Sequence, residues 1–447
     1  MRLKRKPLSL GIISLMFCVN GFAQDVNKTE NLSEIYQIAL KNSPGYQADY
    51  YTMSASKEDK KIALGALLPS LGLSTTASYN DVKASGQSGY YRAYTGSLSL
   101  GQVLFNANLY ETYQAANETA AAASSTYDDQ KQQFMLNVAT AYFNVLQADD
   151  QVSFANANLK AVSSALSQAE DKFTVGVATD VDVKTAKANY YSAVAALKQS
   201  ENARHAADYA LFNYTGELSK NLAPLRQKLN YTAPDPDDVE KWVDIALTNN
   251  ASLRTQHYSE NAAQKSVNAA KGTYLPTVSL AANYSVSDYS GDEDDLALAD
   301  ISAGNARGGY IGLDFSWNIF NGGEDYATEK QAAFAYQAAS FNTLQLQRTI
   351  RQNIETDYYN VLSYVKQIEA YQQSVIAARS AYEQYLARFN VGTATMTDVL
   401  NQLQKLYDSQ TALAASKYQY IETVLQLKYD AGTLSTKDID IFNSWLV

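Results

Sequence analysis

The chain has 447 residues, of which 36 are Lys or Arg and 46 are Asp or Glu, and its formal net charge is −10. An acidic chain is a poor partner for nucleic acid, because phosphate binding needs clustered Lys and Arg side chains. Cys18 is the only cysteine, which excludes an internal disulfide framework and a thiolate metal site.

Residues 1–23 have the pattern of a secretory signal peptide. The apolar run from Leu8 to Val19 is too short for a membrane helix, and small residues before Gln24 suit cleavage there. The run follows four basic residues, Arg2, Lys4, Arg5 and Lys6. A lipid anchor at Cys18 is the less favoured alternative, because Phe17 stands where a lipoprotein signal has a small residue. Cleavage would leave 32 of the 36 basic residues against all 46 acidic ones, in an exported chain.

The rest of the chain contains two copies of one plan. "LSEIYQIALKN" at 32–42 parallels "VEKWVDIALTN" at 239–249, and "AYFNVL" at 141–146 parallels "DYYNVL" at 357–362. Self-similarity of this kind indicates a duplicated structural unit. We therefore predict a first repeat, a linker with three prolines, a second repeat and a C-terminal tail, at residues 24–222, 223–238, 239–432 and 433–447.

Each repeat is predicted to contain a helix, a β-hairpin, one very long helix, a tip and a shorter return helix. The long helices have no Gly or Pro, and at about 1.5 Å per residue each would reach on the order of 100 Å. The hairpin, long helix and return helix are predicted at about 69–106, 107–175 and 179–215 in the first repeat, and at about 276–321, 324–391 and 395–431 in the second.

The hairpin strands alternate between large apolar and small polar residues, which predicts one apolar and one wetted face. A half-buried sheet of a soluble protein would alternate in the same way. Small residues on the wetted face and aromatic residues near the strand ends favour membrane strands around a water-filled bore. The apolar positions are Leu71, Leu73, Ala77 and Tyr79; Tyr94, Leu98 and Leu100; Val278, Leu280, Ala282 and Tyr284; and Ile311, Leu313, Phe315, Trp317 and Ile319.

Apolar residues spaced by seven in the long helices predict coiled-coil packing, and the return helices keep this spacing. Each long helix and its return helix should therefore form an antiparallel coiled coil. The series are Val138, Val145, Val152, Leu159, Leu166 and Phe173, with Ala141, Ala148, Ala155, Val162 and Ala169 beside them; the second copy has Ile354, Val361, Ile368, Val375, Tyr382 and Phe389.

The two tips share one phrase, "FTVGVATDVDV" at 173–183 and "FNVGTATMTDV" at 389–399. Gly176 and Gly392 are predicted to end the long helices, because glycine adopts the left-handed conformation readily. Thr179 with Asp182, and Thr395 with Asp398, are predicted to start the return helices as capping boxes. Capping is a sufficient role for both aspartates, and the alternative is that several tips converge into carboxylate rings at the mouth of a tube.

Four strands cannot close a membrane barrel, since such barrels begin at eight strands. The chain is therefore expected to oligomerise. Two copies would give eight strands and three would give twelve, and three are favoured because side chains fill the interior of an eight-stranded barrel.

The duplicated plan, the "LPS" and "LPT" strand entries and the two tips resemble the TolC family of outer-membrane efflux factors. The resemblance implies a mainly α protein with membrane β structure: a homotrimer whose 12-stranded β-barrel, with four strands per chain, continues into a long α-helical coiled-coil barrel. It implies an outer-membrane location extending into the periplasm, and contact with outer-membrane lipid. It also implies docking to a periplasmic adaptor protein and an inner-membrane RND, ABC or MFS transporter, and export of drugs, toxic small molecules or proteins, without a cofactor.

The resemblance also implies roles for tip residues. Asp398 matches the first acid of the family's periplasmic constriction, and Asn401 stands at the second, usually acidic, position. Asp182 is the corresponding acid of the first tip, and it is expected at the constriction together with Asp398 and Asn401. Phe389 and Ala394 stand where the family has a Tyr and an Arg that latch the closed state, so that latch is not inherited unchanged. The tip residues expected to meet the adaptor are Phe173, Gly176, Thr179, Phe389, Gly392 and Thr395.

The second repeat has an acidic insert, "SGDEDDLALAD" at 290–300, without the ligand spacing of a calcium loop. We expect a solvated external loop, with weak divalent binding or phage and colicin attachment as alternatives. The competing function is an exported coiled-coil scaffold or adhesin without a channel. An enzyme is disfavoured, because no nucleophile–base, paired-acid or metal-ligand spacing stands out.

Overall fold

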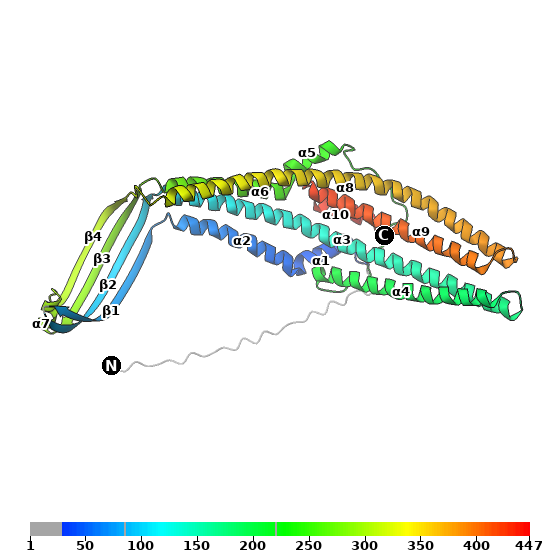
Figure 1. Ribbon diagram of the computed structural model, residues 1–447, viewed down its shortest axis with the longest axis horizontal. Coiled ribbons are helices and arrows are strands. Elements are labelled where there is room, and N and C mark those ends of the chain that lie inside the picture. Colours follow the sequence, from blue (N-terminus) through cyan, green and yellow to red (C-terminus); the bar gives the residue numbers. More distant parts are fainter. Residues whose placement is uncertain (1–28, 85, 220) are drawn as a thin grey trace.

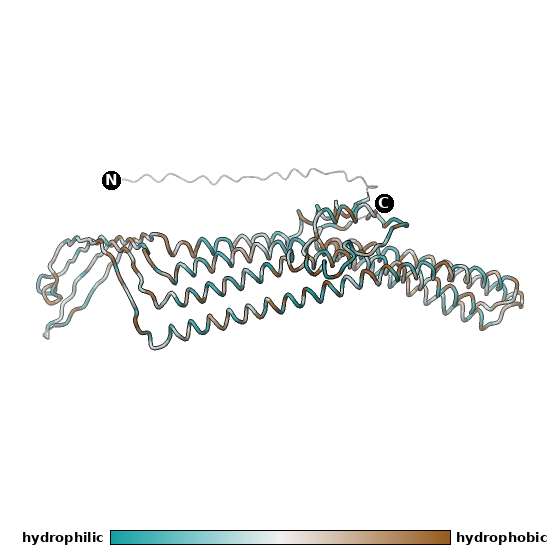
Figure 2. The backbone as a smooth tube through the Cα atoms, turned by 90° about the horizontal axis from the view of Figure 1, so that it is seen from above, coloured by the Kyte–Doolittle hydropathy of each residue, from teal (hydrophilic) through white to brown (hydrophobic). Residues whose placement is uncertain are grey.

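The computed structural model describes residues 29–84, 86–219 and 221–447, so the predicted signal peptide and its cleavage site lie outside the described residues. The molecule is long and narrow. A sheet forms one end, two helical tips form the other, and long helices run between them (Figure 1; Figure 2). Fourteen elements follow one another in the described residues, mostly helices, with four strands. The prediction of a mainly α chain with four strands is confirmed.

The two halves contain the same succession of elements. The first half has α1 (Leu32–Asn42), α2 (Pro44–Gly65), β1 (Ser70–Ala84), β2 (Gln87–Phe105), α3 (Ala107–Thr174) and α4 (Asp180–Thr215). The second half has α5 (Val239–Asn249), α6 (Ala251–Gly272), β3 (Thr277–Gly291), α7 (Glu293–Leu298), β4 (Gly304–Ser316), α8 (Glu324–Asn390) and α9 (Met396–Asp430), followed by α10 (Thr436–Asn443).

Two helices precede each hairpin, where the sequence analysis expected one. Ser43 ends α1 and begins α2, where Pro44 takes the first helical position and its missing N–H leaves no donor unpaired. Asn250 has the same double role in the second half, and its side-chain Oδ1 accepts from the Leu253 N–H at 2.9 Å. Each break lets the chain change direction between a short helix at the middle of the molecule and a longer one that runs to the sheet.

The four strands form one antiparallel sheet in the order β1-β2-β3-β4. Its register aligns apolar residues across all the strands: Leu71 pairs with Leu100, Leu100 with Ala282, and Ala282 with Ile311. The small polar residues align in the same way on the other face, since Ser74 pairs with Ser97 and Ser97 with Ser285. The predicted alternation therefore produces two chemically distinct faces.

The long helices pack side by side. α3 contacts α2 toward the sheet and α4 toward the tip, α6 lies between α3 and α8, and α8 packs along α9 (Figure 1). The most buried heptad series of α3 is the small one, since Ala141, Ala148, Ala155, Val162 and Ala169 are all buried, whereas Phe173 is 46% exposed. Within the described residues, no helix is both long and apolar enough to span a membrane.

The main core lies at the middle of the molecule, where both halves meet. It contains the largest fully buried side chains, including Tyr142, Phe143, Tyr418 and Ile354. The C-terminal segment belongs to this core rather than forming a loose tail, because Ile439 and Phe442 of α10 are buried in it. The linker runs beside this segment, and the Val447 N–H donates to the Pro224 carbonyl at 3.0 Å.

The acidic insert differs from the solvated loop that was expected. Its residues form α7, whose Leu296 is only 1% exposed, and α7 packs mainly against β2. In the described part of the chain, no group of three or more His, Cys, Asp or Glu side chains is arranged to hold a metal ion.

Candidate functional site: the helical tips and the sheet face

Both tips are built from the same backbone motif. Gly176 and Gly392 adopt left-handed φ angles of 77° and 81°. After Gly176 the Val177 N–H donates to the Lys172 carbonyl at 2.8 Å, and after Gly392 the Thr393 N–H donates to the Arg388 carbonyl at 2.9 Å. These bonds satisfy carbonyls that a helix end leaves free, which is why a long helix stops at each glycine.

Both return helices begin with the predicted capping boxes. The Asp182 N–H donates to Thr179 Oγ1 at 3.2 Å, and Asp182 Oδ2 accepts from the Thr179 N–H at 3.0 Å. At the second tip the Asp398 N–H donates to Thr395 Oγ1 at 3.2 Å, and Asp398 Oδ2 accepts from the Thr395 N–H at 2.9 Å. The two boxes have nearly the same hydrogen-bond distances, so both return helices begin in the same way.

The two tips are packed together by a second core. The first hairpin contributes mostly small residues to it and the second contributes large ones, so that side chains of the second lie against alanines of the first. The buried members are Val162, Ala165, Ala169, Ala186 and Ala193 from α3 and α4, and Phe389, Met396, Val399, Leu400 and Leu403 from α8 and α9.

A polar contact joins the tips at the edge of this core. Lys172 Nζ, in the last turn of α3, donates to the Phe389 carbonyl at 2.9 Å and lies 3.6 Å from the centre of the Phe389 ring. A cation over an aromatic face is attracted by the ring quadrupole. Lys172 therefore holds the end of α8 against the end of α3, although the sequence analysis did not identify it.

The predicted tip residues lie in different environments. Asn401 is exposed, while Asp182 and Asp398 are half-buried. Phe173 is 46% exposed, but Phe389 is only 7% exposed beneath Lys172. The Phe389 ring is covered by Lys172 in this chain, and its contact with an adaptor stays a prediction.

Asp398 is held in its charged form. The Thr395 hydroxyl and the Thr395 backbone N–H both donate to its carboxylate, and Arg388 adds a favourable charge, so these groups lower the pKa of Asp398 below its ordinary value. Its carboxylate therefore stays negative at neutral pH.

A small polar cavity lies between the hairpins behind the tips. Its volume is about 210 Å³, and Asn158, Asn189, Gln404 and Tyr407 are among its lining residues. Asn158 is 9% exposed, and its Oδ1 has no hydrogen-bond partner. Sequence reasoning missed this cavity, because it forms only where α3, α4 and α9 meet.

At the other end of the molecule, the apolar face of the sheet is bare. Leu73, Ile311 and Leu313 are 76, 72 and 68% exposed. Among the described helices only α7 makes extensive contact with the sheet. The alternative of a sheet half-buried against the chain's own helices is therefore wrong.

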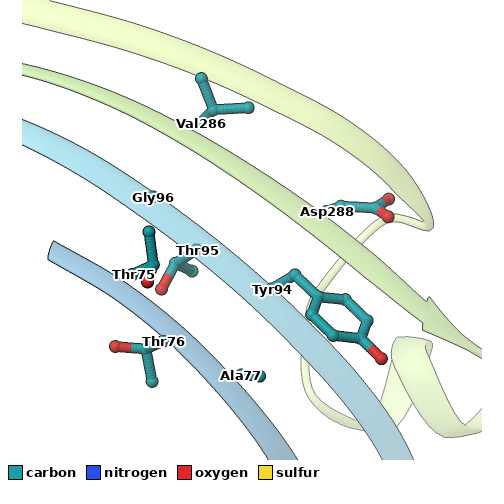
Figure 3. Close-up of a pocket in the computed structure, with 8 residues that line it drawn as sticks. All are labelled: Thr75, Thr76, Ala77, Tyr94, Thr95, Gly96, Val286 and Asp288. Carbon is teal, nitrogen blue, oxygen red and sulfur yellow. The ribbon is translucent and has the colours of Figure 1, made fainter. Parts of the chain in front are cut away.

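Gly96 has no side chain, and Figure 3 shows the hollow around it, with Tyr94 and Asp288 on the side toward α7.

The two ends of the molecule thus carry two copies of one tip motif and one uncovered apolar sheet. The model of the outer membrane efflux protein family matches residues 35–217 and 242–433, one stretch in each half. The chain belongs to this family. The family is one of outer membrane channel proteins rather than enzymes, and the predicted family and outer-membrane location are confirmed.

Individual members of the family show the same relationship. Outer membrane protein TolC of Vibrio cholerae is 31% identical over 93% of this chain and 94% of its own length. Alkaline protease secretion protein AprF of Pseudomonas aeruginosa is 26% identical over 91% of this chain and 85% of its own length. The crystal structure of the CmeC outer membrane channel of Campylobacter jejuni has a TM-score of 0.77 and 20% identity, covering 94% of this chain and 90% of that one. This last likeness supports the fold.

Proposed function

We propose that three copies of this chain form one channel through the outer membrane, which is the exit duct of an efflux or secretion machine. The observation that carries the proposal is the bare apolar face of a sheet whose edge strands are both unpaired. β1 has 15 residues and β4 has 13, and each presents a free row of backbone N–H and C=O groups within the described chain. Such edges pair readily with another strand.

Pairing β4 of one copy with β1 of the next satisfies both edges. The strand order β1-β2-β3-β4 is antiparallel throughout, so β4 and the β1 of a neighbour also run antiparallel. Three copies then make a closed twelve-stranded barrel, with its apolar face toward lipid and its small polar face toward a wide bore. The helices of the three copies continue this bore away from the membrane.

The tips form the far mouth of the bore in this arrangement. We propose that a periplasmic adaptor protein docks there and links the duct to an inner-membrane RND, ABC or MFS transporter. The cargo is a small toxic molecule or a secreted protein. The relative AprF is an alkaline protease secretion protein, which supports the second kind of cargo, and membership of the outer membrane efflux protein family supports the first.

The function is tested by deleting the gene and measuring both drug susceptibility and secreted protein, together with fractionation of the cells. We expect the protein in the outer-membrane fraction, extractable only with detergent, and expect purified protein to conduct ions across a planar bilayer. A monomer that stays in solution in plain buffer and does not conduct would overturn the proposal.

We further propose that Asp398, with Asn401 beside it, sets the charge at the narrowest point, and that Asp182 of the first tip adds a second, weaker contribution to the charge of the constriction. Asp398→Asn removes the charge while an amide can still accept the capping bonds. We expect the block of conductance by multivalent cations to weaken strongly. Asp182→Asn makes the same change at the matched cap, and it should weaken the block less than Asp398→Asn does. Equal effects of the two variants would refute the assignment.

A further inference from the structure

The acidic helix α7 lies over the small-residue face of the sheet. Gly89 of β2 pairs with Val82 of β1. Gly89 lies eight residues from Ser97 along β2, an even number, so it belongs to the same small-residue face as Ser97. A side chain at Gly89 would overlap the Asp295 carboxylate and approach the Asp295 Cα within 2.9 Å. The glycine therefore leaves room for α7 on this face.

Two further contacts hold α7 in place. Beyond the Tyr91–Gly291 pair, β2 continues without β3 beside it, and there Asp295 Oδ2 accepts from the Tyr90 N–H at 3.0 Å. The carboxylate thus replaces the missing strand as a hydrogen-bond partner. Leu296, one residue further, is 1% exposed. A buried leucine and a carboxylate bonded to the backbone indicate a docked helix rather than a free loop.

The acidic residues at the start of α7, including its N-cap Asp292, face solvent. Asp292, Glu293 and Asp294 are exposed, while Asp295 and Leu296 take up the contacts with the sheet. Among the described residues no helix lies between β1 and β2, since Ala84 of β1 already pairs with Gln87 of β2. Each chain therefore carries one helix, with three exposed carboxylates, on the small-residue side of its outer rim.

We propose that α7 folds into the bore at the outer mouth of the channel, where three copies narrow the opening and disfavour large and negatively charged solutes. This inference rests on the proposed function, which turns the small-residue face inward. A ring of Asp and Glu side chains in a pore favours cations. The outer mouth would then have a size and charge preference of its own, at the end of the molecule opposite the tips.

The test uses chemical labelling of a cysteine behind α7 in intact cells. Because the only cysteine lies in the predicted signal peptide, Ser97→Cys places a single thiol on the small-residue face, deeper than α7. Thiol reagents are added outside: a small cationic and a small anionic methanethiosulfonate, and a maleimide carried on polyethylene glycol. Labelling from this side does not depend on whether the tips are open.

Deletion of residues 292–303 leaves Ser290 and Gly291 as a two-residue turn between Tyr289 and Gly304, which already pair. We expect this deletion to speed labelling by the large reagent much more than by the small ones. Asp292→Asn with Glu293→Gln and Asp294→Asn keeps the helix and should remove the preference for the cationic reagent. Glu58→Gln with Asp59→Asn, two exposed acids on α2, is the matched control and should change neither rate.

The outcomes separate the two proposals. Equal rates for all reagents in the parent, the deletion and the neutralised variant would overturn the constriction while the channel remains. Leu98→Cys places the thiol on the apolar face. If it were labelled as fast as Ser97→Cys in intact cells, the apolar face would not be against lipid and the proposed function itself would fail.

Discussion

The two tips have nearly the same sequence and the same caps, but they differ in what covers them. Phe173 of the first tip is 46% exposed and Phe389 of the second is 7% exposed. The residues before them differ as well: Lys172 reaches across to the second tip, whereas Arg388 Nη2 donates at 3.4 Å to the Thr393 carbonyl of its own turn. The two repeats thus have the same local turn. They differ where the tips pack together, since the first tip contributes alanines and the second contributes the large side chains that lie against them.

The largest expected effect comes from the two matched phenylalanines. Phe389→Ala should cost about 3–5 kcal/mol, because it removes a buried ring and leaves a cavity. Phe173→Ala removes a ring that is nearly half exposed and should cost much less. Hydrogen exchange of the amide groups at the end of α8 and the start of α9 measures the free energy of local opening. Similar losses in both variants would show that the tips are equivalent after all.

The second comparison concerns a carboxyl group that only one copy has. Asp357 occupies the position of Ala141 in the first copy, since "DYYNVL" parallels "AYFNVL". Burial and the nearby Asp430 carboxyl raise the pKa of Asp357 to about 8, and its Oδ2 has no hydrogen-bond partner. The unfolded chain releases this proton near pH 4 and the folded chain holds it to about pH 8, so stability falls as the pH rises between these values.

Asp357→Ala restores the residue of the first copy and should raise the melting temperature at pH 8. The gain in melting temperature should be smaller at pH 5, where the buried Asp357 carboxyl lowers the stability of the folded chain only slightly. Thermal unfolding of the detergent-solubilised protein at both pH values measures this. Glu355→Ala, at an exposed position paired with Arg351, is the control and should show no such pH dependence. A loss of stability at pH 8 in Asp357→Ala would contradict the argument.

A smaller effect is expected at the caps, where the two tips are alike. Thr179→Ala and Thr395→Ala each remove the hydroxyl of a capping box and should each cost about 1 kcal/mol. Hydrogen exchange in the first turns of α4 and α9 reports the two losses separately. A clear inequality would mean that packing between the hairpins, rather than the local motif, sets the stability of the caps.

The smallest expected effect is that of the contact between the tips. Lys172→Met keeps the apolar stem but removes the charge above the Phe389 ring, which is worth about 0.5–1 kcal/mol at an exposed site. Arg388→Met should have less effect on the contact between tips, because Arg388 bonds within its own turn. A double-mutant cycle with Phe389→Leu isolates the pair. A coupling energy near zero would show that the cation over the ring does not help to hold the tips together, since the bond to the Phe389 carbonyl survives Phe389→Leu.

Local sequence patterns predicted much of the fold. Period-two alternation predicted the four strands and their two faces, and the absence of Gly and Pro predicted helices of about 100 Å. Gly176, Gly392 and the two Thr–Asp pairs predicted the tips, because these motifs act through bonds within a few residues. The division at Ser43 and Asn250 was missed, since one capping residue inside an otherwise helical stretch is a weak signal.

The sequence by itself determined that this protein has duplicated hairpins, strands that alternate between apolar and small polar residues, and two matching caps, since each depends on neighbours in the chain. That the apolar face of the sheet is exposed was decided by the tertiary structure. Tertiary structure alone decided which of the two phenylalanines is buried, because the same phrase surrounds both. It also placed Lys172 beside Phe389, 217 residues away, and Asp295 beside Tyr90, 205 residues away. Contacts at such separations depend on how helices and strands align over the whole molecule, which local patterns do not encode.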